Sequence, residues 1–195
     1  MRATIVVLTA LVAAASPAKA DWRPVERVET YRVEGKTGLA LYRSIGERGP
    51  RVGPTRAIAY TDFKLLWSRD YRPRADGSCV LATARPSLTI NYRLPDAAGP
   101  LPPDTKARWN SFLEGIRAHE RVHGAIIIEM VKKIEAFSAG LSADNDPGCK
   151  KVRAKLQARL GELSREQRQA SRDFDRDELS QGGNVHRLVL GLVND

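Results

Sequence analysis

Long hydrophobic runs are scarce in this sequence of 195 residues. The only one, residues 3–15, is shorter than the roughly 20 apolar residues that a membrane-spanning helix needs. Pro17 interrupts it, and Ala18 and Ala20 are the small residues that a signal peptidase reads. We therefore predict a cleaved signal peptide over residues 1–20, a periplasmic or secreted protein, and no stable membrane insertion of the mature chain.

Cysteine is also scarce, with Cys79 and Cys149 as the two residues of this type and no C-x-x-C pair. Without such a pair, thiolate ligation of zinc is a poor reading. Two cysteines in an exported chain are usually joined to each other. We predict a Cys79–Cys149 disulfide that ties the N-terminal half to the connection after the central helix.

A dense basic block interleaved with aromatic residues is absent, although 32 Lys and Arg face 23 Asp and Glu. The predicted leader holds two bases, Arg2 and Lys19, and no acids, so cleavage lowers the net charge from +9 to +7. Scattered bases on an exported chain argue against nucleic-acid binding. The remaining residues, 21–195, suit one domain with its own core, and their composition specifies no oligomeric state.

The first half of this domain has the pattern of strands and turns. Short apolar or alternating segments predict strands at residues 25–33, 57–67 and 79–92, with a small helix at 39–45. Residues 94–103 are rich in proline and glycine, which predicts a linker. We expect an antiparallel sheet in this half.

The second half has helical periodicity. Apolar residues recur at helical spacing from Asp104 or Thr105, either of which can cap a helix, to Gly140, where glycine suits the C-terminal end. A second amphipathic helix is predicted from about residue 150 to 174, followed by a glycine-rich tail. Together the two halves predict an α+β fold.

The first of these helices carries His119-Glu120-Arg121-Val122-His123. Residues four apart share a helix face, so His119 and His123 can bind one Zn²⁺ at about 2.0–2.1 Å. Glu120 lies beside the first ligand, where its carboxylate can serve as the catalytic acid/base for a water molecule. The alternative is an accidental motif, with a salt-bridged glutamate beside two surface histidines.

The sequence offers two candidates for the third ligand. Ile126 and Glu129 stand where a metzincin continuation would place glycine and histidine. We predict His186, the remaining histidine, as the third ligand beside His119 and His123. An acidic cluster at the end of the second helix stays open as an equal alternative. Its members are Asp173, Asp175, Asp177 and Glu178.

Several short pieces occur in an order similar to that of a known family. They are Tyr31, Val33, Gly35 and Lys36; Gly49-Pro50; Thr61-Asp62-Phe63 with Trp67; Gly77 with Cys79; Leu94-Pro95; Trp109 with Phe112; and the motif from His119 to His123. With them the chain resembles a bacterial family of unknown function known as predicted secreted zinc-dependent proteases. The resemblance implies His119 and His123 as zinc ligands and Glu120 as the catalytic residue. Ser180 departs from it, because a histidine is expected there after the matching pair Phe174-Asp175.

Residues 21–195 are thus predicted to form a single zincin-like metalloprotease domain, in which Glu120 activates water to attack peptide bonds of a peptide or protein substrate. The alternative is a non-catalytic protein on the same fold, either a metal-binding pseudoenzyme or an envelope interaction module. An intact Glu120 favours the enzyme, whereas the uncertain third ligand favours the pseudoenzyme.

Overall fold

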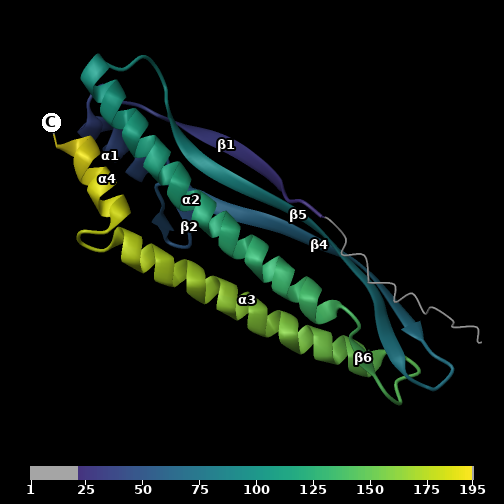
Figure 1. Ribbon diagram of the computed structural model, residues 1–195. Coiled ribbons are helices and arrows are strands. Elements are labelled where there is room, and N and C mark those ends of the chain that lie inside the picture. The colour runs from purple at the N-terminus through teal and green to yellow at the C-terminus, as the bar shows by residue number, and fades with distance from the viewer. Residues whose placement is uncertain (1–21, 195) are drawn as a thin grey trace, which may run out of the picture.

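The computed structural model describes residues 22–194, and the predicted signal peptide at residues 1–20 lies outside them. The described residues form an α+β fold, as predicted, with four helices and a four-stranded sheet (Figure 1). In chain order the elements are β1 (Val25–Val33), α1 (Gly38–Arg48), β2 (Arg51–Val52), β3 (Thr55–Arg56), β4 (Tyr60–Pro73), β5 (Cys79–Ala97), α2 (Pro103–Ser138), β6 (Ser142–Ala143), α3 (Lys150–Leu179) and α4 (Asn184–Val193). Within residues 22–194, no helix is both long and apolar enough to cross a membrane.

The sheet is mixed, so the prediction of an antiparallel sheet is wrong for one of its strands. β4 pairs with β5 in the antiparallel direction, but β1 pairs with β5 in parallel. The strand order β1-β5-β4 places the last long strand between the other two. Parallel neighbours need a long crossover connection, and residues 34–59, which contain α1 and the small β2-β3 hairpin, form part of it.

β5 also extends into the segment that was predicted to be a linker, because Leu94 and the residues after it pair with β1. The strand contains Pro86 and Pro95, which cannot donate a backbone hydrogen bond. Pro86 precedes the part of β5 that pairs with β1, and Pro95 follows the part that pairs with β4. Each proline therefore lies where one of the two flanking strands is missing, as strand prolines require.

Helices α2 and α3 form a second layer, in which they lie side by side and run in opposite directions (Figure 1). Leu88 and Ile90 of β5 are buried against Ile127 and Ile134 of α2, and Leu163 of α3 joins the same cluster. The first helix was correctly predicted, although its start lacks the expected side-chain cap. Thr105 is instead buried and donates to the carbonyl oxygen of Lys36 at 3.1 Å.

The motif helix lies unusually close to the sheet at one residue. A Cβ atom added to Gly124 would lie 2.1 Å from the hydroxyl oxygen of Tyr92, which is a buried residue of β5. Glycine at this position permits that approach, since any other side chain would displace the tyrosine or the helix.

The predicted disulfide between Cys79 and Cys149 is confirmed. It joins the beginning of β5 to the residue immediately before α3, and both cysteines are buried. The bond therefore holds the tip of the β4-β5 hairpin against the α2-α3 connection.

Removing this disulfide is expected to destabilise the protein. The cysteines are 70 residues apart, and closing a loop of that length constrains the unfolded chain by about 4 kcal/mol in the chain-entropy model. The Cys79→Ala/Cys149→Ala variant should lose about that much unfolding free energy in urea titrations at equilibrium. Wild-type protein treated with a reductant is the matched control. Equal stability of the oxidised, reduced and substituted forms would contradict this account.

Candidate metal centre

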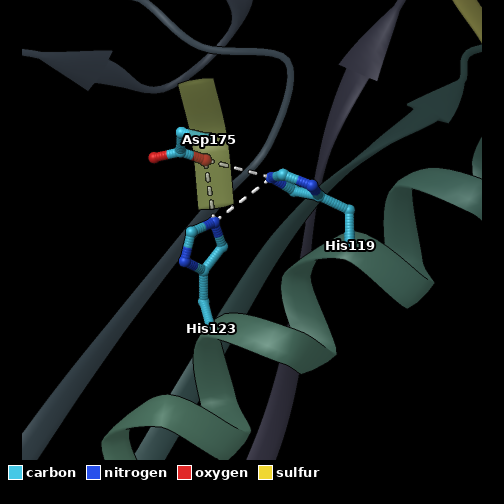
Figure 2. Close-up of side chains that lie close together, drawn as sticks. All are labelled: His119, His123 and Asp175. Carbon is cyan, nitrogen blue, oxygen red and sulfur yellow. Dashed lines mark hydrogen bonds and ion pairs between the residues drawn. The ribbon is translucent and has the colours of Figure 1, made fainter. Parts of the chain in front are cut away.

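His119 and His123 on α2 face Asp175 on α3, and the three side chains point toward one another (Figure 2). Asp175 Oδ1 lies 3.2 Å from His119 Nε2 and 3.0 Å from His123 Nε2. The two Nε2 atoms are 3.2 Å apart. Three atoms that commonly bind metals therefore form a nearly equilateral triangle.

The spacing of the three atoms is compatible with a divalent cation. The three contacts cannot all be hydrogen bonds at once, because the two nitrogens have no proton between them when both Nε2–H groups point at Asp175. Ligands at about 2.0–2.1 Å from a tetrahedral zinc ion lie roughly 3.3 Å apart, close to the spacings of 3.0–3.2 Å. Two imidazoles and one carboxylate are also a ligand set that zinc accepts in catalytic sites.

Asp175 reaches the histidines because α3 is longer than predicted. The helix continues to Leu179, five residues beyond the expected end at Phe174. The Phe174 ring stacks on His119, with ring centroids 4.7 Å apart and an interplanar angle of 22°, and meets His123 edge-on at 5.4 Å. This stacking fixes the last turns of α3 against the motif helix and shields His119 from water.

His186, the predicted third ligand, does not join this group. It lies on α4, where its Nδ1 accepts a hydrogen bond from the backbone N–H of Gly182 at 3.2 Å. The acidic alternative is the one that the structure brings to the histidines, and it does so through Asp175. The signal in the sequence was the Phe174-Asp175 pair, which matched the family pattern.

The other acids of the cluster have different surroundings. Asp173 and Asp177 both pair with Arg176, at 2.8 Å and 3.7 Å. Glu178 lies on the far side of the His119 ring, with Oε2 3.7 Å from Nδ1. Helix α3 therefore places Asp175 next to Nε2 of His119 and Glu178 next to its Nδ1.

Glu120 lies beside this group and is buried, with 5% of its surface exposed. Thr61 of β4 donates its hydroxyl to Glu120 Oε2 at 2.5 Å and also lies 3.3 Å from the Glu120 carbonyl oxygen. Burial raises the pKa of Glu120, although the Thr61 hydrogen bond and the charges of both histidines oppose the rise. A carboxylate with a raised pKa holds a proton more readily than an exposed one, which suits a general acid/base.

Asp175 and His123 each favour the charged form of the other. Burial favours the neutral form of Asp175, but hydrogen bonds from His119 and His123 outweigh it and hold the pKa of Asp175 well below its usual range. Burial likewise favours neutral His123, but the hydrogen bond to Asp175 and the charges of Asp175 and Glu120 raise its pKa above 6.5. Both shifts favour an ion pair between Asp175 of α3 and His123 of α2, whose Oδ1 and Nε2 atoms are 3.0 Å apart.

This ion pair predicts the pH dependence of the metal-free protein. A raised pKa of His123 in the folded state contributes stability below pH 6.5, which is lost as the pH rises through that raised pKa. The lowered pKa of Asp175 costs stability only in strong acid. Chelator-treated protein should thus have a lower Tm at about pH 8 than at about pH 6. Asp175→Asn should reduce this difference, and a Tm that rises over the same interval would contradict the prediction.

Two histidines and a carboxylate from adjacent helices, with a buried glutamate beside them, define a candidate divalent-metal centre in an α+β protein. The chain belongs to the family described as "Bacterial protein of unknown function (DUF922)", whose model matches residues 28–183. This confirms the bacterial family of unknown function in the resemblance. The matched region includes His119, Glu120, His123 and Asp175 and ends before His186. Searches of curated proteins and of solved structures found no match.

Proposed function

We propose that the protein is an exported zinc-dependent peptidase with His119, His123 and Asp175 as its metal ligands. The observation that carries the proposal is the convergence of their three ligand atoms to within 3.2 Å of one another, next to a buried glutamate. Asp175 takes the place that His186 held in the sequence-based prediction. Three protein ligands leave one position for water or substrate, as catalytic zinc sites require.

The residues around the site divide the chemistry between them. Bound zinc would act as a Lewis acid toward a peptide carbonyl. Glu120 would take a proton from the attacking water and pass it to the leaving amine. Thr61 holds Oε2 of Glu120 and so directs the carboxylate. Phe174, stacked on His119, keeps that ligand in place.

An extended peptide is the substrate that suits the surrounding sheet. In the four-stranded sheet β4 has β5 as its neighbour on one side, and its other edge is unpaired in the strand order. A peptide that pairs with this edge by main-chain hydrogen bonds would pass close to Thr61 and hence to Glu120. An edge strand beside the motif helix is also what the predicted zincin-like arrangement requires.

Export is proposed from two features of the chain. The disulfide suits an oxidising compartment such as the periplasm or the cell exterior. The N-terminal segment has the pattern of a signal peptide, although it lies outside the described residues. Both features agree with a periplasmic or secreted location.

Zinc content and proteolysis test the proposal together. The full-length chain, expressed with its own N-terminal segment and no metal-binding tag, should contain about one zinc per chain by elemental analysis. It should cleave an unfolded protein. This proteolytic activity should be lost when a chelator is added and restored when zinc is added back. His119→Ala should lose both properties, whereas Arg117→Ala, an exposed change on the same helix, should keep both.

The outcomes separate the alternatives. A protein that remains metal-free after incubation with excess zinc would overturn both the metal site and the peptidase. Zinc without any cleavage would favour the non-catalytic metal-binding protein instead.

A further inference from the structure

One nitrogen of the candidate metal centre is left without a partner. His119 is 8% exposed, and its Nδ1 is buried with no hydrogen-bond partner among the described residues. Its Nε2 faces Asp175 and His123. Buried polar atoms in folded proteins nearly always have partners, so this one needs an explanation.

The proposed metal site determines what Nδ1 requires. A neutral imidazole carries one proton, and Nε2 must be unprotonated to bind a metal. With the metal bound to Nε2, the proton of His119 therefore lies on Nδ1. This nitrogen is then a buried hydrogen-bond donor that needs an acceptor. Histidines that bind metals usually donate from their second nitrogen to a carboxylate, a carbonyl oxygen or a water molecule.

The nearby acid on α3 has the right position to be that acceptor. Glu178 lies three residues after Asp175, so both point from the same face of α3. Its Oε2 is 3.7 Å from His119 Nδ1, and the side chain is 22% exposed. This distance is only slightly longer than a hydrogen bond, so we expect a small rotation of the carboxylate to close it.

We propose that Glu178 accepts the Nδ1–H hydrogen bond of His119 and so holds this ligand in the tautomer and orientation that the metal needs. Glu178 is then a positioning residue, because it acts on the metal only through His119. The inference rests on the proposed metal site, and it assigns the two acids of α3 different roles. Asp175 offers an oxygen to the metal, and Glu178 supports the ligand.

Neighbouring residues provide no equivalent support. Phe174 covers the face of the His119 ring and carries no polar side-chain atom. Asp177 is 77% exposed and pairs with Arg176, so it serves as a matched control next to Glu178 in the chain.

Zinc affinity measures the contribution of Glu178. The full-length protein is titrated with zinc in competition with a chromophoric chelator. Glu178→Ala should weaken zinc binding by roughly 10- to 100-fold, as is typical when the partner of a metal-binding histidine is lost. Glu178→Gln should lose less, because its amide oxygen still accepts a hydrogen bond. Asp177→Asn should bind zinc as tightly as wild type.

A spectroscopic measurement separates positioning from a general change in stability. In zinc-loaded protein with ¹⁵N-labelled histidine, the Nδ1–H proton of His119 should exchange slowly with solvent and become fast in Glu178→Ala. Unchanged affinity and exchange in Glu178→Ala, with zinc still lost in His119→Ala, would overturn the role of Glu178 alone. A wild-type protein that binds no zinc would overturn the metal site, and this inference with it.

Discussion

Replacing Asp175 by alanine is expected to abolish stable zinc binding. The substitution removes one of three ligand atoms and leaves His119 and His123 as a two-nitrogen site. Loss of a residue that merely supports a ligand weakens metal binding by roughly 10- to 100-fold, and loss of a ligand should cost more. Elemental analysis after dialysis should therefore find almost no zinc in Asp175→Ala, against about one per chain in wild type.

Two further variants make this result specific. His186→Ala should retain zinc, since His186 is engaged with the backbone of Gly182 on α4. Asp177→Ala should also retain it, because that carboxylate pairs with Arg176 instead. If Asp175→Ala retained zinc and His186→Ala lost it, His186 would be the third ligand and the contact between Asp175 and the histidines would be an ion pair only.

The choice between these ligands illustrates what local patterns can and cannot predict. The spacing of His119 and His123 places both on one helix face, and the structure has them so. Asp175 lies 56 residues after His119, and its position depends on how α3 packs on α2. The periodicity of apolar residues within α3 does not predict how this helix packs on α2. In the structure, the stacking of Phe174 on His119 brings Asp175 to the site.

The fold was predictable to a similar degree. Helical periodicity identified α2 and α3, and alternating segments identified β1, β4 and β5. The parallel pairing of β1 with β5 was missed because it joins segments that lie far apart in the chain. The predicted end of α3 was too early, because the last turns of the helix carry mostly polar residues. Contacts of Phe174 and Asp175 with α2 hold these turns in place.

Glu120 has an electrostatically costly position beside the candidate ligands. Its carboxylate is buried and one residue from His119, and Thr61 of the edge strand fixes one of its oxygens. Burying a charge is costly, which is why the pKa of Glu120 is raised. In the proposed reaction, a buried carboxylate with a raised pKa suits proton transfer.

Replacing Glu120 by glutamine should therefore separate catalysis from metal binding. The amide has the same shape and can still accept the Thr61 hydrogen bond, but it cannot take up a proton. Proteolysis should fall by roughly 100- to 10,000-fold, the usual contribution of a general acid/base, while zinc content stays at about one per chain. Because the amide carries no charge to bury, Tm should be equal to or higher than that of wild type. Glu129→Gln, an exposed change on the same helix, should leave both activity and zinc unchanged. Full activity in Glu120→Gln would mean that another group moves the proton, and loss of zinc in this variant would mean that Glu120 itself holds the metal.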